Sequence, residues 1–178
     1  ADPRELEYSG GKLRAGPTVI DLVYKRILIA ELVGREGLDS PLVRAVRERA
    51  AVMVNPFKCK VLHKKASLAV LSDERNADLF DAGMRATVAR HVPWTRVVED
   101  RRTVIDGATV DLLPFLAGNR DRFVLKPNDD YGGTGIVLGW EVSDAAWGAA
   151  LGRALEAPHI VQERIHLPEE AFPTWVDG

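Results

Sequence analysis

The sequence predicts an α+β fold in which antiparallel strands surround a glycine-rich loop and helices flank them. Two β-rich runs, "RFVLKP" and "GIVLGWEV", lie on either side of this loop, as the strands of a hairpin do. Segments with helical spacing and N-cap residues precede and follow the pair. Hydrophobic residues make up 46% and charged residues 28% of the 178 residues, so the chain can bury a sizeable core.

The first forty residues predict a strand and then a helix. A period of two in "GPTVIDLVYKRI" indicates a strand, although the apolar run that continues to Ile29 also suits a helix. Further along, Asp39 or Ser40 can cap a helix that carries Pro41 in its first turn.

The next segments predict a strand and two helices. "AVMVN" has the composition of a short buried strand, and "HKKASLAVLSD" has the spacing of a helix. We expect Ser72 to cap a further helix, because Asp73 and Glu74 then lie at the positive end of its dipole. The residues predicted to share one face of that helix are Phe80, Met84 and Val88.

The remaining residues predict the hairpin, another helix and a last strand. The stretch from His91 to Arg122 indicates a loop, a strand–turn and a short helix before the hairpin. Ser143 and Asp144 begin a helix, and "HIVQERI" is a short final strand. The predicted apolar face of that helix consists of Trp147, Leu151 and Leu155.

Charge and composition argue against several classes of protein. The 24 basic and 26 acidic residues give a net charge of −2, whereas proteins that bind nucleic acids or membrane surfaces carry a basic excess. No apolar run approaches the ~20 residues of a membrane span, and no signal-peptide pattern opens the chain. The single cysteine, Cys59, excludes an intrachain disulfide and predicts a cytoplasmic protein. The chain begins at Ala1 without a methionine, and we expect it to be part of a longer protein.

Common metal and nucleophile motifs are missing from the sequence. It contains no HExxH, no paired CxxC and no G-x-S-x-G, so neither a zinc site nor a serine hydrolase is expected. Cys59 lies between two lysines, and we interpret it as a buried structural thiol. The histidines that lack metal-ligand spacing are His63, His91, His159 and His166.

The loop of the hairpin, "KPNDDYGGTG", combines charge with glycine. Backbone N–H groups of residues 132–135 can approach an anion closely, because glycine has no side chain in the way. Lys126 offers the same anion a compact positive charge, and Asp130 offers Mg²⁺ an oxygen ligand. The pattern suits a nucleoside triphosphate, but it is neither a Walker A loop nor G-x-G-x-x-G, because the lysine precedes the glycines and a strand follows them. The alternative is an ordinary hairpin with a solvated lysine and aspartate.

Two other segments have both a functional and a structural interpretation. "HIVQERI" ends in Gln162 and Glu163, which can line an adenine slot, or it is an edge strand with solvated charges. Lys64 and Lys65 precede an amphipathic run and can be either nucleotide ligands or the solvated start of a helix.

Taken in order, these segments resemble a known family. "RFVLKPNDDYGGTGIVLGW" followed by "HIVQERI" is similar to the central part of an ATP-grasp domain. The upstream segments resemble the circularly permuted ATP-grasp proteins, which include uncharacterised bacterial proteins and the synthetase domain of glutathionylspermidine synthetase, related to glutathione synthetase. The resemblance runs from about Leu6 to about Pro168 and is most specific in "KPNDDYGG" and "HKKA". It implies an N-terminal part, residues 1–100, and a truncated ATP-grasp subdomain, residues 101–178.

The resemblance also implies roles in binding ATP and Mg²⁺. Lys65 corresponds to the first nucleotide lysine of the family, with Lys64 as the alternative if the register shifts by one, and Lys126 corresponds to the second. Asp130 stands where related enzymes carry a magnesium-binding glutamate. The implied phosphate loop consists of Tyr131, Gly132, Gly133 and Thr134, and the implied hinge for adenine and ribose consists of Gln162, Glu163 and Ile165.

The implied function is that of an ATP-dependent carboxylate–amine ligase, or a fragment of one, which forms an amide through an acylphosphate. Lys126 and Arg26 are the implied catalytic residues, and Arg26 would hold a small-molecule carboxylate that reacts with an amine. Relatives have a pair of arginines where this chain has Lys25 and Arg26. The family completes its metal site with a further acid and an asparagine, which we expect outside this chain. The alternative function is a non-catalytic nucleotide-binding or assembly module on the same fold.

Overall fold

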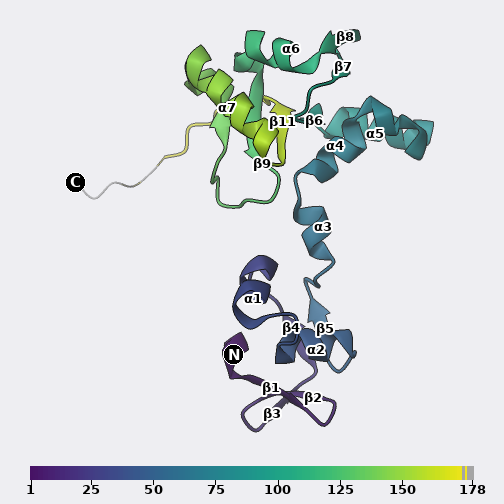
Figure 1. Ribbon diagram of the computed structural model, residues 1–178, viewed down its shortest axis with the longest axis vertical. Coiled ribbons are helices and arrows are strands. Elements are labelled where there is room, and N and C mark those ends of the chain that lie inside the picture. The colour runs from purple at the N-terminus through teal and green to yellow at the C-terminus, as the bar shows by residue number, and fades with distance from the viewer. Residues whose placement is uncertain (174, 176–178) are drawn as a thin grey trace. The chain divides into compact units, whose positions relative to one another are not determined.

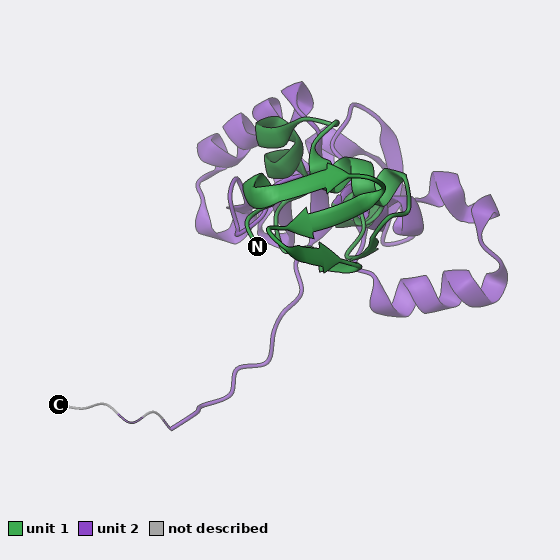
Figure 2. Ribbon diagram, turned by 90° about the horizontal axis from the view of Figure 1, so that it is seen from below, with its two compact units in different colours: residues 1–63 green, residues 64–178 purple. Residues whose placement is uncertain are grey.

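Helices and strands are mixed along the chain and most strand pairs are antiparallel, which confirms the predicted α+β class (Figure 1). The structure is a computed structural model that describes residues 1–173 and 175. It divides into unit 1, residues 1–63, and unit 2, residues 64–178 (Figure 2). This division rests on compactness, and the boundary at residue 100 that the resemblance implies stays a prediction. Among the described residues, no helix is long and apolar enough to cross a membrane.

Unit 1 contains a three-stranded antiparallel sheet and a parallel pair of strands. β1 (Leu6–Ser9), β2 (Lys12–Ala15) and β3 (Thr18–Ile20) are neighbours in sequence order. β4 (Leu22–Tyr24) pairs in parallel with β5 (Val52–Val54). The segment that suited either a strand or a helix therefore forms two strands, β3 and β4.

The helices of unit 1 are short and cover its own small core. η1 (Pro3–Glu5) opens the chain, and α1 (Ile29–Glu36) follows β4. α2 (Pro41–Arg47) begins at the predicted proline after Ser40, where the missing N–H of proline costs nothing. α3 (Cys59–His63) ends the unit. The core consists of Leu6, Leu13, Leu32, Leu42, Val43, Ala45, Ala51 and Met53.

Two expectations for unit 1 are wrong in detail. The sequence predicts a buried β5, but Met53 is the one buried residue of this strand and Val52 is 65% exposed. The reason is that β4 and β5 form a sheet of only two strands, which leaves one face open. Cys59 is exposed and is therefore not the buried thiol that its apolar character predicted.

Unit 2 is built on a four-stranded antiparallel sheet of order β10–β9–β11–β6. β9 (Phe123–Pro127) and β10 (Val137–Leu138) form the predicted hairpin around the glycine-rich loop. β11 (His159–Glu163), the predicted last strand, pairs with the other side of β9. β6 (Thr95–Val97) completes the sheet beside β11.

Helices cover one face of this sheet. α7 (Asp144–Glu156) starts at the predicted cap Ser143, crosses β9 and β11, and buries Trp147 fully (Figure 1). α6 (Leu112–Gly118) packs against α7 and accepts a hydrogen bond from the Trp147 indole at Leu116 O. Leu155 is 50% exposed, so the predicted apolar face of α7 ends one turn earlier than expected.

The other elements of unit 2 surround the sheet. The predicted strand–turn is the hairpin of β7 (Arg102–Ile105) and β8 (Ala108–Asp111). α4 (Ala66–Ser72), the predicted helix after the two lysines, contacts β6 and β11. The short 3-10 helices are η2 (Glu74–Leu79), η3 (Arg120–Arg122) and η4 (Gly139–Glu141).

The helix that follows α4 begins later than predicted. Ser72 is the last residue of α4, and its hydroxyl donates to Leu68 O instead of capping a new helix. Asp73 caps η2, and α5 (Ala82–His91) starts only after Asp81, which caps it. Phe80 lies outside α5, and α5 buries no residue, so the predicted apolar face does not form.

Candidate functional site

Lys126 and Gln162 lie on one face of the central strand pair. Lys126 on β9 is opposite Ile160 on β11, and strand residues two apart share a face, which brings Gln162 to the same side. The Lys126 Nζ donates a 2.6 Å hydrogen bond to Gln162 Oε1. Gln162 is 7% exposed and Lys126 is half-buried, so the strand pair fixes the position of this ammonium group.

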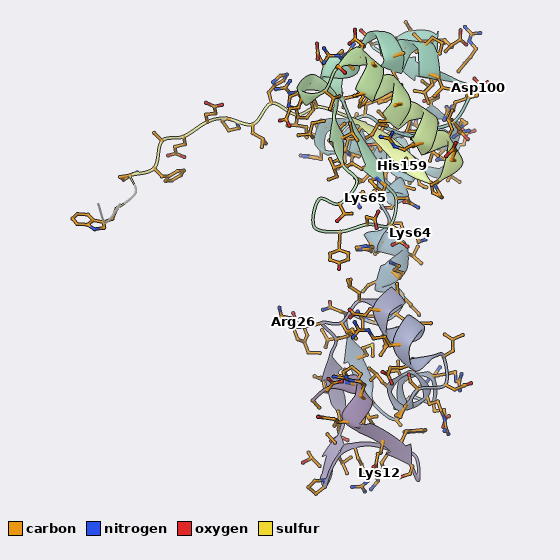
Figure 3. All side chains as sticks on the ribbon, turned by 60° about the vertical axis from the view of Figure 1, so that its left-hand side comes forward. Lys12, Arg26, Lys64, Lys65, Asp100 and His159 are labelled. Atoms are coloured by element: carbon orange, nitrogen blue, oxygen red, sulfur yellow. The ribbon has the colours of Figure 1, made fainter. Side chains whose placement is uncertain are left out.

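The segment "HKKA" meets the loop of the hairpin (Figure 3). The Lys65 N–H donates to Asn128 O at 3.0 Å, and the Ala66 N–H donates to Asn128 Oδ1 at 2.9 Å. The Lys65 Nζ donates to the carbonyl oxygen of Asp130 at 2.5 Å. Lys64 pairs instead with Asp129, at 3.5 Å. The two segments that carry the most specific part of the resemblance are thus in contact, although about sixty residues separate them.

The two lysines interact through their charges. Burial lowers the pKa of Lys126, and the positive charge of Lys65 lowers it further. Both ammonium groups donate to neutral oxygens, Lys126 to the amide of Gln162 and Lys65 to the backbone carbonyl of Asp130. We call Lys65, Lys126 and Gln162 the lysine cluster. It holds two positive charges close together, and among the described residues neither ammonium group donates to an acidic side chain.

The glycine-rich loop is exposed and turns through left-handed backbone conformations. Gly132, Gly133 and Gly135 have φ of 65°, 82° and 71°, which residues with a side chain rarely adopt. Within the loop, the Thr134 N–H donates to Tyr131 O at 3.2 Å. A Cβ at Gly135 would lie 2.6 Å from Cγ of Pro127, so the loop end packs closely on the strand. Tyr131 and the carboxylate-bearing Asp130 are exposed.

The predicted hinge consists of the last two residues of β11, Gln162 and Glu163, and of Ile165 just after the strand. Glu163 accepts from Arg122 at 3.3 Å through its carboxylate, and its N–H donates to Trp94 O. The Arg164 N–H donates to Arg122 O. It is therefore not available as a donor to an adenine base, and other backbone groups of the segment would have to make such contacts. Ile165 is 60% exposed. A cavity of about 580 Å³ lies beside the segment, lined by Leu71, Phe80, Val88, Trp94, Glu163 and Ile165 among others.

A second cavity, of about 730 Å³, borders the loop as well, because Lys64, Asn128, Asp130 and Gly135 contribute to its lining. Leu125 and Pro127 line it, and these residues alternate with Lys126 along β9, so they face the opposite side of the strand. Its charged lining includes Arg153 and His159, and the His159 Nδ1 contacts Ala157 O at 2.9 Å. This larger hollow is therefore not the space that Lys126 faces.

A second group of charges in unit 2 was not expected from the sequence. We call Asp73, Glu74, Arg96 and Arg101 the arginine cluster. Arg96 is 2% exposed and pairs with Glu74 at 2.6 Å, and Arg101 pairs with Asp73 at 2.5 Å and with Glu74 at 2.6 Å. Burial opposes ionisation of Asp73, but hydrogen bonds from Arg101 and Arg75 outweigh it and hold the pKa of this carboxyl far below its usual range.

Sequence reasoning also missed two polar residues beside the lysine cluster. Asn128 joins Lys65 and Ala66 to the hairpin, and its place between Pro127 and two aspartates was the available signal. Thr95 is fully buried and accepts a 2.9 Å hydrogen bond from Gln162 Nε2. No local pattern marks Thr95, because its partner lies 67 residues away.

Neither Arg26 nor a complete metal site is part of the lysine cluster. Arg26 is exposed in unit 1, whereas the other candidate residues belong to unit 2, and its role stays a prediction. In the part of the chain that the structure describes, no group of three or more His, Cys, Asp or Glu is arranged to hold a metal ion. Asp130 therefore offers one carboxylate, which is enough only where phosphate oxygens supply further ligands.

Comparison with known proteins gives one informative similarity. No protein-family model matches the chain. The chain is 27% identical over 166 residues to a protein of Frankia casuarinae (strain DSM 45818 / CECT 9043 / HFP020203 / CcI3) named "Putative glutamate--cysteine ligase 2-2". The match covers 89% of this chain and 17% of that protein, so the chain spans about a sixth of the length of this relative.

Proposed function

We propose that this chain is the nucleotide-binding part of an ATP-dependent carboxylate–amine ligase of the circularly permuted ATP-grasp type. The observation that carries the proposal is the lysine cluster: Lys65 and Lys126 come from distant segments, lie close together and donate to neutral oxygens. Two adjacent ammonium groups repel each other, and an anion between or beside them would relieve that repulsion.

A nucleoside triphosphate matches the groups around the cluster. Phosphate oxygens would accept from Lys65 and Lys126, and the backbone N–H groups of Gly132 and Gly133 would add neutral donors, whereas the Thr134 N–H already donates to Tyr131 O. Asp130 at the start of the loop would bind Mg²⁺ together with the phosphates, as nucleotide sites commonly use one or two carboxylates. The residues present therefore fit Mg-ATP as a ligand, whereas they do not form a complete metal site of their own.

The end of β11 and the residues just after it suit the adenine end of the nucleotide. The cavity of about 580 Å³ has the size of a small-molecule site, and aromatic and aliphatic residues supply much of its lining. Glu163 and Ile165 border this cavity, and Gln162 connects the same strand to Lys126. In this proposal Gln162, Glu163 and Ile165 form the hinge.

The reaction class rests on the relative and on the chemistry of the site. The name of the Frankia protein describes a ligase for glutamate and cysteine, and we propose the same class of reaction, amide formation from a carboxylate and an amine, for the protein to which this chain belongs. Lys65 and Lys126 would stabilise the negative charge that develops on the transferred phosphoryl group. Arg26 would hold the carboxylate substrate, since a guanidinium binds carboxylates in a bidentate manner.

Calorimetric titration of Mg-ATP into this chain tests the proposal. The wild type should bind saturably, Lys126→Ala should bind at least about tenfold more weakly, and Asp130→Ala should lose the dependence of affinity on Mg²⁺. Lys12→Ala is the matched control, because Lys12 is an exposed lysine on β2 in unit 1. If neither the folded wild-type chain nor the longer protein shows heat of binding with Mg-ATP, the nucleotide site is excluded.

A further inference from the structure

Thr95 on β6 is connected to Lys126 through Gln162. Its side chain is fully buried, and its hydroxyl donates to Pro93 O at 2.8 Å. With its hydrogen committed to Pro93, Thr95 Oγ1 can still accept, and it accepts from Gln162 Nε2 at 2.9 Å. The other end of the same amide, Gln162 Oε1, accepts from the Lys126 Nζ at 2.6 Å.

The hydrogen bonds allow one orientation of the Gln162 amide. An ammonium group only donates, so Lys126 requires the oxygen end of the amide. Thr95 Oγ1, already donating to Pro93, requires the nitrogen end. A flipped amide would place Nε2 hydrogens against the ammonium and Oε1 against a lone pair, and both contacts would be repulsive. The Thr95 hydroxyl therefore selects the amide orientation that Lys126 needs.

Thr95 itself is held firmly. Its N–H donates to the hydroxyl of Ser72 at 3.2 Å, and its carbonyl accepts from Arg96 Nη1 at 2.8 Å. The register of β6 against β11 places Thr95 opposite Gln162. These contacts keep the hydroxyl in place from α4, from β6 and from the neighbouring strand.

We propose that Thr95 is a positioning residue: by fixing the Gln162 amide, its hydroxyl holds the Lys126 ammonium group where a phosphate group of the nucleotide binds. Thr95 does not touch the nucleotide in this arrangement and acts through Gln162. The last step rests on the proposed function, whereas the effect on Lys126 does not require any ligand.

Replacing Thr95 with valine removes the hydroxyl and keeps the shape, and serine restores the hydroxyl without the methyl group. The matched control is Thr103→Val, because Thr103 is 2% exposed but its hydroxyl accepts from Arg96 Nε. In the ligand-free chain, the side-chain signals of Gln162 and the ammonium signal of Lys126 are followed by heteronuclear NMR. Thr95→Val should shift the Gln162 signals and speed solvent exchange at Lys126, while Thr95→Ser and Thr103→Val should leave both as in the wild type.

Titration with Mg-ATP gives the second readout. Loss of the hydrogen bond between Gln162 and Thr95 should weaken the binding of Mg-ATP about five- to tenfold in Thr95→Val. Thr95→Ser should recover most of the affinity. In a Gln162→Leu background, Thr95→Val should cause no further loss, because the route to Lys126 is already broken. Unchanged Lys126 signals in Thr95→Val, or equal changes in Thr103→Val, would overturn the positioning role. A folded wild type that shows the NMR effect but binds no Mg-ATP would instead overturn the nucleotide step.

Discussion

The arginine cluster and the lysine cluster use charge in opposite ways within unit 2. In the arginine cluster, Arg96 and Arg101 face the carboxylates of Asp73 and Glu74, and positive and negative groups match one to one. In the lysine cluster, two ammonium groups donate to an amide and a backbone carbonyl, both of which are neutral.

This difference matches a structural role for the arginine cluster and the proposed ligand-binding role for the lysine cluster. Buried charges that are paired and hydrogen-bonded are costly to break but need nothing further, so the arginine cluster fits a role in holding η2, β6 and β7 together. A pair of like charges with neutral acceptors lacks its counter-charge, and a phosphate group would supply it. The sign of the missing charge therefore points to the kind of ligand.

The largest effect is expected from breaking the arginine cluster. Arg96→Ala would leave Thr103 Oγ1, Ser72 O and one Glu74 oxygen without their donor and should lower the free energy of unfolding by about 3–5 kcal/mol. Denaturation by urea measures this change. The control is Arg102→Ala, because the pair of Arg102 with Asp111 is exposed and should contribute at most about 1 kcal/mol. Equal effects of the two substitutions would contradict the structural role of the cluster.

A smaller effect is expected from the loop beside the lysine cluster. Gly135→Ala combines a left-handed backbone with a Cβ 2.6 Å from the ring of Pro127, and should cost about 2–4 kcal/mol of unfolding free energy. Gly133→Ala has the same backbone strain but open space around its Cβ, and should cost about 1–2 kcal/mol. Urea unfolding of both variants provides the comparison. If Gly133→Ala proves the more damaging substitution, the hairpin packing described here is wrong.

Lys126→Met should weaken binding but leave the fold almost intact. Loss of a charged hydrogen bond to phosphate costs about 1.5–3 kcal/mol, which lowers the affinity for Mg-ATP roughly tenfold to a hundredfold. The free energy of unfolding should change by less than about 1 kcal/mol, because desolvation of Lys126 offsets its hydrogen bond to Gln162. Calorimetry and urea unfolding on one preparation check both values. A variant that loses stability and binding together would place Lys126 among the structural charges.

The smallest effects concern pH, and in both clusters stability rises with pH, in an acidic range for Asp73 and in an alkaline range for Lys126. The pKa of Asp73 is depressed in the folded state, so its stabilisation is present above the unfolded value of about 4 and is lost as the pH falls below it. The pKa of Lys126 is also depressed, so between its folded value and about 10.4 the unfolded chain binds more protons and folding becomes more favourable as the pH rises. Urea unfolding across pH, compared with Asp73→Asn and Lys126→Met, isolates each contribution. Identical pH profiles for wild type and variants would contradict the two assignments.

Local patterns predicted the elements around the site well. The glycines between two apolar runs predicted the β9–β10 hairpin, and Ser143 with Asp144 predicted the start of α7. These signals succeed because a tight turn and a helix cap depend on neighbouring residues. Ser72 shows the limit of local patterns, because its hydroxyl contacts Thr95, which lies 23 residues away in the sequence. The helix cap predicted at Ser72 is formed by the adjacent Asp73.

The residues of the candidate site also divide into those that local patterns predicted and those that they missed. Lys65, Lys126 and Asp130 were found from charge beside glycine and from the resemblance, and the structure places Lys65 against both Asn128 and Asp130. Thr95 and the arginine cluster were missed, because a buried threonine or arginine is recognisable only through partners from other strands.

Paramagnetic NMR with ATP and Mn²⁺ in place of Mg²⁺ tests the central claim most directly. Bound Mn²⁺ broadens the signals of nearby nuclei, so the spectrum of the whole chain locates the phosphate site without relying on substitutions. The account predicts selective broadening at Lys65, at Lys126 and in the loop from Asp130 to Thr134. Broadening confined to unit 1, or to the cavity beside Arg153 and His159 while the loop signals persist, would contradict it.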